Sequence, residues 1–588
     1  MFTNLFKHKL IQLAVCLACV LAWSCGVEAQ DDESKTLAPR TGSLSGRVVN
    51  ENGEPLAQAT IYVMARSLPQ PRLTATDERG SFEITGLDAS VFNLNVSMPG
   101  YVTPPRSPDG QPPYYRIGDS VTLSMIKGGV ITGRVTSATG EPLVEAGVRA
   151  ILIRDADDKA PAGPRFPIER STDDRGVYRI YGLSPGTYLV SAGGRAYGYS
   201  ANAYDGDSPT YAPSSTREVA AEVTVHAGEE ITGVDIRHRG EPGHTVSGIV
   251  SGPSAPNTGP NITLTPIVNG APQSGVSAFQ SSNTKGFAFF GVADGVYDLI
   301  AQSYLGVGET AASEPLRVTV KGGDLTGINL VVKGLAAIRG HLAFEDSVAP
   351  ACKNKRKPLL AETLLNVRRS DKATTKPELS FPNFFAQAAP DQSGDFLLRN
   401  LGPGQFNLNV RFFAKYWYLR SIARDVAGAT LPRNGAASRK IDVARTGIHL
   451  KFGERVSGLT VILAEGAASL RGAVKLAEGE SLPAKLFMNL VPAEKENAED
   501  VLRFFTVPVN SDGTFAVNNL PPGRYWTLAR IAGDDERQSD FNLRAPEGSD
   551  QRAQIRLAAE AARNSLEFKP CENVTNYELL FKTQAPKN

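Results

Sequence analysis

Histidines are the first residues in this sequence that could hold a catalytic metal. Zinc sites need three or four converging His, Cys or carboxylate ligands, usually with two of them close in the sequence. His238 and His244 are the nearest pair, but they lie in a stretch rich in Gly and Pro, without helical spacing. We therefore expect surface histidines, with no metal and no cofactor. The histidines beyond the N-terminal segment are His226, His238, His244, His341 and His449.

One segment formally matches a serine nucleophile. Residues 182–186 read G-L-S-P-G, which fits the G-x-S-x-G nucleophile elbow and would require a strand-to-helix turn around Ser184. The same turn recurs elsewhere in the chain with Gly402 and Pro521 at the serine position. We therefore expect Ser184 to fill a turn position and expect no catalytic residue.

Acidic turns are a candidate for calcium. Carboxylates and turn carbonyls suit Ca²⁺ as oxygen ligands, and the pairs Asp77-Glu78 and Asp173-Asp174 lie at expected turns. They lack the dense spacing of a loop that wraps an ion. Asp side chains that bond to their own backbone are the preferred interpretation.

Two aromatic segments are the best candidates for binding, one at residues 193–213 and one at residues 415–418. Flat rings beside amide and carboxylate groups suit a sugar or a protein partner. Such segments can also cover a sheet face or seal a junction between modules, and both interpretations stay open here. The candidate ligand-binding residues are Tyr197, Tyr199, Tyr204, Tyr211, Tyr416, Trp417 and Tyr418.

An internal repeat predicts the elements that carry these residues. A short apolar strand with a central glycine opens five segments, which indicates five modules. Its glycines are Gly46, Gly133, Gly248, Gly340 and Gly472.

The second half of the repeat is a hairpin turn that leads into a strand with an inward aromatic residue, as in the D-E-R-G-S-F of residues 77–82. A further turn and strand follow, and F-N-L-N-V occurs twice, at residues 92–96 and 406–410. Strict alternation places the apolar residues on one face and both asparagines on the other. We therefore predict an all-β fold, a tandem array of about five small immunoglobulin-like or prealbumin-like β-sandwiches, with a short C-terminal helix.

The predicted boundaries follow from the repeat. Only short Gly-containing links separate the modules, so we expect them to stand close together. A helix over residues 550–564 is expected after Ser549, with Ile555, Ala558, Ala559 and Ala562 on one face. The expected segments are a signal peptide at 1–29, a linker at 30–42, modules at 43–126, 127–240, 241–333, 334–464 and 465–532, and a tail with the helix at 533–588.

The first module resembles a known family. Its G-R-V at 46–48, G-E-P-L at 53–56, G-S-F at 80–82 and P-G-Y at 99–101 are similar to the carboxypeptidase regulatory-like domain. This resemblance implies a transthyretin-like sandwich that is also grouped with carbohydrate-binding-like folds. It further implies a periplasmic, outer-membrane-associated or extracellular location. Nothing in the chain resembles the zinc peptidase that this domain accompanies in carboxypeptidases.

The N-terminus predicts export. Lys7 and Lys9 precede an apolar run over 10–21, and V-E-A at 27–29 predicts cleavage between Ala29 and Gln30. A lipid anchor on Cys25 stays open as an alternative. No later segment is apolar for long enough to cross a membrane as a helix, so we expect no transmembrane segment after cleavage.

Net charge argues against nucleic acid as a partner. Cleavage removes Lys7, Lys9 and Glu28, which leaves 60 basic and 60 acidic side chains. Nucleic-acid binding needs a basic excess on some face. We therefore expect no nucleic-acid partner.

Two cysteines, Cys352 and Cys571, remain after cleavage. In an oxidising compartment they are a candidate disulfide, with two free thiols as the alternative.

Two functional hypotheses remain. The first is a non-catalytic exported binding or adhesion protein whose ligand is a glycan or a cell-envelope protein. The second is an accessory or scaffold subunit of a cell-envelope enzyme or nutrient-uptake complex. The sequence decides neither the ligand nor the oligomeric state.

Overall fold

The protein is described from a computed structural model that divides into two units, Met1–Thr41 and Gly42–Asn588. The description covers residues 41–581, with gaps at 66–67, 69, 105–112, 160–166, 195–202, 257, 273–275, 280–285, 354, 356, 371–386, 427–438, 477–480, 484 and 532–547. The predicted signal peptide, with Ala29 and Gln30, lies outside the described residues.

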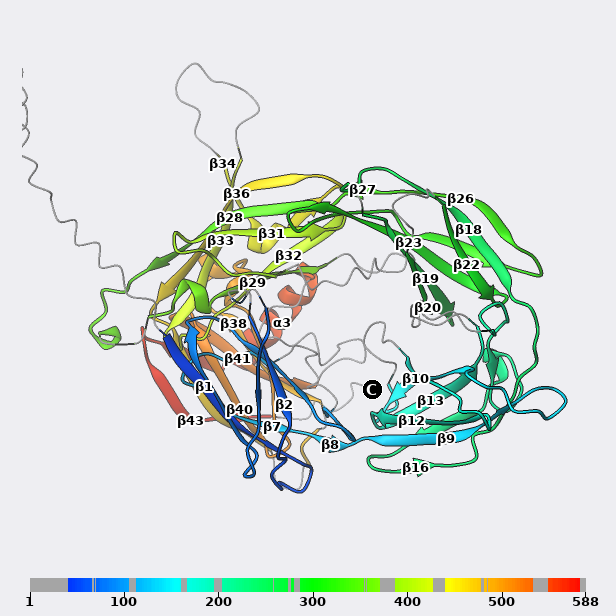
Figure 1. Cartoon of the computed structure of the whole chain (residues 1–588). Coiled ribbons are helices and arrows are strands. Elements are labelled where there is room, and N and C mark those ends of the chain that lie inside the picture. Colours follow the sequence, from blue (N-terminus) through cyan, green and yellow to red (C-terminus); the bar gives the residue numbers. More distant parts are fainter. Residues whose placement is uncertain are drawn as a thin grey trace, which may run out of the picture. The chain divides into compact units, whose positions relative to one another are not determined.

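The expected all-β fold is confirmed, since strands dominate the described part of the chain (Figure 1). Its α-helices are α2 (Val443–Thr446), which is a single turn, and α3 (Ser549–Ala562). No helix among the described residues is both long and apolar enough to cross a membrane.

The described residues form five β-sandwiches, which we name the first to fifth modules in chain order. In one sheet of each module, the opening strand lies between a hairpin strand and a closing strand, and the closing strand runs parallel to it. The opening, hairpin and closing strands are, in order, β1 (Thr41–Val49), β4 (Ser81–Asp88) and β7 (Ser120–Ser124); β9 (Gly129–Thr136), β12 (Val177–Leu183) and β16 (Glu230–Ile231) with β17 (Ile236–Arg237); β18 (His244–Ser251), β22 (Gly286–Val292) and β26 (Leu325–Val331); β28 (Ala336–Glu345), β31 (Asp395–Leu401) and β36 (Arg455–Glu465); and β37 (Ala468–Lys475), β40 (Thr514–Leu520) and β43 (Asn573–Leu580). In the fourth module this sheet continues through β33 (Trp417–Val426) and β34 (Arg439–Asp442).

The second sheet of each module packs on the first. Its strands are β2 (Thr60–Met64), β3 (Arg72–Ala75) and β5 (Asn93–Ser97) in the first module; β10 (Gly147–Asp155), β11 (Ile168–Ser171), β13 (Gly186–Ala192), β14 (Thr210–Tyr211) and β15 (Glu222–Val225) in the second; β19 (Asn261–Val268), β20 (Ala271–Pro272), β21 (Val276–Phe279), β23 (Gly295–Gly306), β24 (Glu309–Ala312), β25 (Leu316–Val320) and β27 (Lys333–Gly334) in the third; β29 (Leu364–Arg369), β30 (Gln387–Ala388), β32 (Gly404–Arg411) and β35 (Ile448–Leu450) in the fourth; and β38 (Leu486–Pro492), β39 (Phe505–Pro508), β41 (Gly523–Ile531) and β42 (Ser565–Phe568) in the fifth. Short strands β6 (Tyr101–Val102) and β8 (Ile126–Lys127) pair beside the link between the first two modules.

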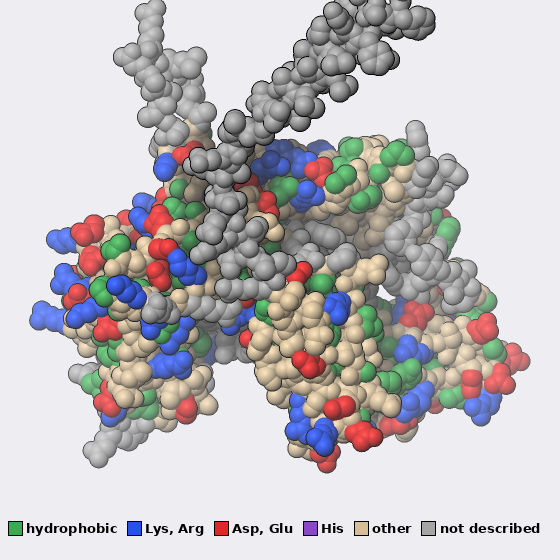
Figure 2. Space-filling model, turned by 60° about the vertical axis from the view of Figure 1, so that its left-hand side comes forward, with side chains coloured by type: hydrophobic (Ala, Val, Ile, Leu, Met, Phe, Trp, Pro, Cys, Tyr) green, Lys and Arg blue, Asp and Glu red, His purple; other side chains and the backbone are tan. Residues whose placement is uncertain are grey.

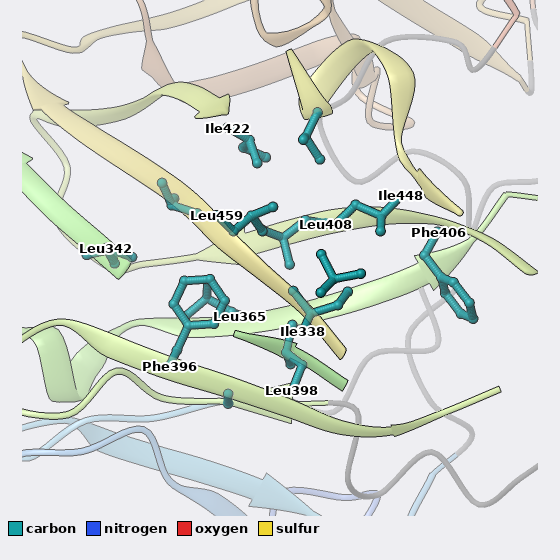
Figure 3. Close-up of a cluster of buried hydrophobic side chains, with 14 of the residues drawn as sticks. Ile338, Leu342, Leu365, Phe396, Leu398, Phe406, Leu408, Ile422, Ile448 and Leu459 are labelled. Carbon is teal, nitrogen blue, oxygen red and sulfur yellow. The ribbon is translucent and has the colours of Figure 1, made fainter. Parts of the chain in front are cut away.

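Each module has its own buried core. In the fourth, Ile338 from β28 and Phe396 and Leu398 from β31 meet Leu365 and Leu408 from the facing sheet (Figure 3). Burial of a side chain of this size contributes about 1.5–3 kcal/mol. Separate cores of this kind are what allows a long chain to fold module by module.

The recurring opening glycine has a steric cause. A Cβ on Gly248 would lie 2.0 Å from the backbone oxygen of Ile328 in the closing strand. A Cβ on Gly472 would lie 2.2 Å from the Tyr577 oxygen and 2.8 Å from the Phe515 ring of the hairpin strand. Only glycine lets the closing backbone and the inward aromatic ring approach the opening strand together.

The C-terminal segment belongs to the fifth module. β42 pairs with β41 and β43 pairs with β37, and Phe568 and Leu579 lie in the fifth core. The expected boundary at residue 532 therefore separates strands that the structure pairs. The helix forms where expected and buries Ile555 and Ala559, whereas Ala558 and Ala562 are exposed and the Ser549 side chain makes no capping bond.

Candidate functional site

The first aromatic segment contributes to the second module and its edge. Tyr197 and Tyr199 lie outside the described residues. Tyr204 packs against the core of the module, edge-on to buried His238 at 5.8 Å between ring centroids. Tyr211, in β14, is 9% exposed and packs with neighbouring apolar residues. The described part of this segment is therefore largely packed.

The second aromatic segment lies in the fourth module. Trp417 is fully buried and packs edge-on against Phe344 at 5.3 Å. Because no part of its ring is exposed, Trp417 is a core side chain and offers no surface to a ligand. Tyr416 is partly buried and lies below Lys355, with Nζ 4.7 Å from its ring centroid. Tyr418 is also partly buried, and burial raises its pKa.

The fourth-module segment makes contacts across to the fifth module. The side-chain amide of Asn519, at the end of β40, donates to the backbone oxygens of Ala414 at 2.8 Å and Trp417 at 2.7 Å. The Asn573 amide donates to the Tyr416 hydroxyl at 3.3 Å, and this hydrogen bond is the main cause of a lowered Tyr416 pKa. These residues thus help to seal a junction, one of the two roles that the sequence left open.

The same position is used at the junction between the third and fourth modules. Asn400 ends β31 as Asn519 ends β40, and both have positive φ, 60° and 61°. The Asn400 side chain accepts from the Thr310 backbone at 2.9 Å and donates to the Gly308 oxygen at 2.9 Å, in the β23–β24 hairpin of the third module. The side chain of each asparagine is therefore hydrogen-bonded to the backbone of the preceding module.

Glycine takes this position in the first three modules. Gly291, with φ +67°, ends β22, and a Cβ there would lie 2.5 Å from the Asp205 oxygen and 2.6 Å from the Asp207 oxygen of the second module. Gly182 packs against Gly128 in the preceding link. On Gly86 of the first module, a Cβ would meet no described atom within 4 Å. We call this recurring position the junction slot: Gly86, Gly182, Gly291, Asn400 and Asn519.

A cleft of about 710 Å³ lies where the second and third modules meet. Its volume is typical of small-ligand sites, which often form at domain interfaces. The second module contributes Tyr211 and Arg217, and the third contributes Phe290, Tyr297 and Lys321. The sequence interpretation included only Tyr211 among them.

Aromatic side chains and charged groups of both signs line the cleft. Phe290 is 48% exposed, and the Arg217 guanidinium lies 5.9 Å from the Tyr211 ring centroid. The Tyr297 hydroxyl donates to the Ala293 oxygen at 2.8 Å, and burial raises the pKa of this tyrosine. Phe290 follows buried Phe289 in β22. Because side chains alternate along a strand, Phe290 must point outward, and this outward aromatic residue is the sequence signal for the cleft that the sequence interpretation missed.

The serine of the G-x-S-x-G match has a structural role. The Ser184 backbone oxygen accepts a hydrogen bond from the Tyr188 hydroxyl at 2.7 Å. Tyr297 and Tyr525 make the same bond to the residue four positions earlier, at 2.8 and 2.9 Å. The repeated bond shows that this turn is a corner of the sandwich at which the serine side chain is incidental.

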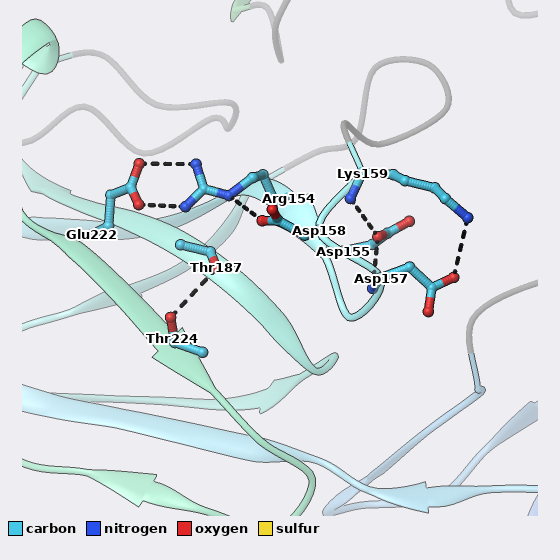
Figure 4. Close-up of polar contacts among 8 residues, drawn as sticks. All are labelled: Arg154, Asp155, Asp157, Asp158, Lys159, Thr187, Glu222 and Thr224. Carbon is cyan, nitrogen blue, oxygen red and sulfur yellow. Dashed lines mark hydrogen bonds and ion pairs between the residues drawn. The ribbon is translucent and has the colours of Figure 1, made fainter. Parts of the chain in front are cut away.

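The acidic turns bind their own backbone. The Asp173 carboxylate accepts hydrogen bonds from the backbone amides of Arg175 and Val177. The hydrogen bond from the Arg175 guanidinium is the main cause of a lowered Asp173 pKa, and the backbone bonds lower it further. In an earlier turn of the second module, the Asp155 carboxylate likewise accepts hydrogen bonds from the backbone amides of Asp157 and Lys159 (Figure 4). No group of three or more His, Cys, Asp or Glu side chains suited to a metal occurs among the described residues.

Charges on the surface are mixed. On the face seen in Figure 2, Lys and Arg side chains alternate with Asp and Glu over the described residues. Arg154, for example, binds Glu222 and lies 2.7 Å from Asp158 in the second module (Figure 4). Exposed pairs of this kind contribute little to stability because water screens the charges.

A disulfide joins Cys352 of the fourth module to Cys571 of the fifth, with Cα atoms 5.4 Å apart. Both cysteines are buried, at 2% and 6% exposure. The link crosses the same junction as Asn519. The fourth and fifth modules are therefore held together both covalently and by hydrogen bonds.

Comparisons with known proteins identify the first module. Residues 43–113 match the model of the carboxypeptidase regulatory-like domain. No curated protein matches the chain.

The chain is also similar to several solved structures. They include the Bacillus anthracis TIE protein (17% identity, TM-score 0.14, 50% of this chain and 51% of that chain), the shaft pilin SpaA from Lactobacillus rhamnosus GG (13%, 0.16, 34% and 98%) and BcpA, the major pilin subunit of Bacillus cereus (11%, 0.14, 50% and 99%). The chain thus spans about half the length of the Bacillus anthracis protein. Residues 43–113 are a carboxypeptidase regulatory-like domain, the first in a series of β-modules.

Proposed function

We propose that this chain is an exported, non-catalytic modular binding protein of the cell envelope, and that the cleft between the second and third modules takes its ligand. The observation that carries the proposal is the cleft itself, with aromatic rings contributed by both modules and guanidinium groups contributed by the second. Export rests on the predicted signal peptide with cleavage between Ala29 and Gln30.

A glycan is the ligand class that fits this lining best. An exposed ring such as Phe290 can stack on the apolar face of a sugar, while Arg217 and Lys321 can donate to its hydroxyl groups. The family of the first module supports this choice, because the resemblance places it among carbohydrate-binding-like folds. Tyr197 and Tyr199 remain part of the proposal, since they belong to the segment that leads into the Tyr211 wall of the cleft.

The test is binding of residues 30–588 to a glycan array, with Phe290→Ala as the main variant. Tyr181→Ala is the matched control, since Tyr181 is 45% exposed but does not line the cleft. Loss of a specific glycan signal in Phe290→Ala alone supports the proposal. Equal binding by both variants would place the ligand elsewhere.

The second candidate is an accessory or scaffold subunit, favoured by the junction slots that hold successive modules together. A scaffold would bind no glycan and would instead retain a protein partner from the envelope. Absence of binding across the array, together with a stable complex in a pull-down that survives Phe290→Ala, would favour this candidate.

A further inference from the structure

The closing strand of the third module leaves one of its edges open. β26 pairs with β18 on one side, and no described strand pairs with its other side. The backbone amide of Val332, just after β26, donates to the Ser251 oxygen of β18. Because backbone groups alternate along a strand, those of Val331 and Asn329 are directed away from β18. The open edge therefore presents N–H and C=O groups at the spacing that another strand needs for pairing.

The fourth module shows the equivalent edge with a strand on it. The closing strands of the two modules have the same register against their opening strands. Ile328 lies opposite Gly248 in the third module and Leu459 lies opposite Gly340 in the fourth, with a register shift just before each pair. In the fourth module, β33 pairs antiparallel with the other side of β36. This position in the repeat is therefore compatible with an added antiparallel strand.

One glycine in each closing strand distinguishes the open edge from the occupied edge. Gly327 in β26 and Gly458 in β36 have nearly the same φ, +74° and +78°. A Cβ on Gly458 would lie 3.0 Å from the Asp425 oxygen of β33, whereas a Cβ on Gly327 would meet no described atom within 4 Å. The two closing strands thus share a backbone conformation, and the space that β33 fills in the fourth module is open in the third.

The strand β33 also contributes a side chain to the fourth core. Ile422 lies opposite Val461 and belongs to the same core cluster as Leu459, which is 1% exposed (Figure 3). The equivalent residue of the third module, Ile328, is only partly buried, and so is Val318 on β25 of the facing sheet. The third core therefore leaves apolar surface uncovered at the position that Ile422 takes in the fourth.

The sequence of β26 lacks the usual protection of an edge strand. Its residues 325–331 read L-T-G-I-N-L-V, without a charged side chain or a proline, and Val331 is 48% exposed. Natural edge strands commonly carry charges or Pro, which prevent unwanted pairing. The closing strand of the fifth module, for comparison, carries Glu578, which pairs with Lys475 at 2.7 Å. An uncharged edge is what a strand that pairs with a partner requires.

We propose that β26 binds an extended peptide segment of a partner protein, which joins the sheet as an antiparallel strand in the register of β33. Backbone hydrogen bonds would supply affinity, and an apolar side chain at the position of Ile422 would supply selectivity. A second copy of this chain fits less well, because inward side chains of its own β26, such as Leu330 at 2% exposure, are already buried in their own core.

This site is separate from the cleft proposed for a glycan. None of the residues of β26 lines that cleft in the described structure. The two proposals can therefore fail or succeed independently.

The test uses a fluorescent synthetic peptide with the sequence of residues 417–426, W-Y-L-R-S-I-A-R-D-V, because this segment makes the required pairing in the fourth module. The whole mature chain is titrated into the peptide, and binding is followed by fluorescence polarisation. We expect the peptide to bind. The same peptide with Ile422→Asp should bind about tenfold or more weakly, because it would bury an unpaired carboxylate.

Two variants of the chain form a matched pair. Val331→Pro removes an N–H that is directed to the open edge and should weaken binding about tenfold or more. Val331→Thr keeps this N–H and a β-branched side chain, and should bind within about twofold of the unmodified chain. No binding by the unmodified chain, or equal binding by the two variants, overturns the proposal.

A second measurement needs no variant and so does not depend on correct folding of one. Hydrogen exchange of the unmodified chain is followed by mass spectrometry with and without the peptide. We expect the peptide to slow exchange at Asn329 and Val331 and to leave β43 unchanged. Protection confined to the fourth module would show that the peptide only replaces β33, and would contradict the proposal.

Light scattering on the chain alone tests the other occupant of this edge. We expect a monomer. A dimer that Val331→Pro converts into a monomer would assign the edge to a second copy of the chain and overturn the assignment to a partner protein.

Discussion

The side-chain amide of Asn519 donates to the backbone oxygen of Trp417 at 2.7 Å, which fixes the end of β40 in the fifth module to the aromatic segment of the fourth module. Asn400 makes the equivalent contact with Gly308 at the preceding junction. At the junction slot, the asparagines of the last two modules make side-chain hydrogen bonds to the preceding module. In the third module, Gly291 instead allows the backbone of the preceding module to approach closely. The aromatic segment at residues 415–418, which the sequence predicts as a candidate binding loop, therefore contacts the fifth module.

The contribution of the slot can be measured at Asn519. Asn519→Gly keeps a residue that tolerates the φ of 61° but loses both side-chain hydrogen bonds, and Asn519→Ala loses the bonds and adds backbone strain. We expect Asn519→Gly to lower the free energy of unfolding of the fifth module by about 1–3 kcal/mol and Asn519→Ala to lower it further. Denaturant unfolding followed by Trp fluorescence checks both. Equal stability of the Gly variant and the unmodified chain would show that the amide contacts contribute nothing.

The opening glycine makes a prediction with a control in the same module. Gly248→Ala places a Cβ 2.0 Å from the Ile328 oxygen, whereas Gly323→Ala meets nothing within 4 Å. The first change must displace the parallel closing strand β26 and should destabilise the third module by about 1–3 kcal/mol or more. The second should change stability by about 0.5 kcal/mol or less. Thermal unfolding of both variants checks the difference, and similar melting temperatures would refute the steric account.

The disulfide predicts a response to reductant. Cys352 and Cys571 are separated by 219 residues in the chain, so their link removes considerable freedom from the unfolded state. We expect reduction, or the double change Cys352→Ser and Cys571→Ser, to cost about 2–5 kcal/mol. Melting curves with and without dithiothreitol check this. The double variant is the control, because its melting temperature should not respond to dithiothreitol.

The repeat was visible in the sequence because the fold imposes it locally. Gly472 and Phe515 must face each other within one sheet, so both residue types recur at fixed spacing and predict the sandwich. The fifth closing strand was missed because Asn576 takes the positive φ, 57°, that Gly458 takes in the fourth module at 78°. Asparagine tolerates this conformation, so the backbone repeats while the glycine pattern does not.

The candidate site was less predictable because it depends on contacts between modules. Tyr211 and Phe290 line one cleft from segments far apart in the chain, and no local pattern relates them. Trp417 illustrates the opposite error, since its exposed-looking sequence context hides complete burial against Phe344. Local sequence patterns predict strands and turns. They do not predict the cleft, because the cleft forms only where one module packs on the next.

Buried His238 predicts how the second module responds to acid. Burial lowers its pKa, and Asp207, with its carboxylate oxygen 3.7 Å from Nε2, only partly opposes this effect. The folded protein therefore holds a neutral imidazole, while the unfolded chain takes up a proton below about pH 6.5. The contribution of neutral His238 to stability is therefore fully present above that pH. It is lost as the pH falls from the pKa of the unfolded state to the lower pKa of the folded state. We expect His238→Gln to reduce the fall in melting temperature between pH 8 and pH 5.5, although it lowers stability at pH 8. His449→Gln, at an exposed histidine on β35, is the control and should retain the fall of the unmodified chain. A fall that is unchanged in His238→Gln would assign the acid response to other groups.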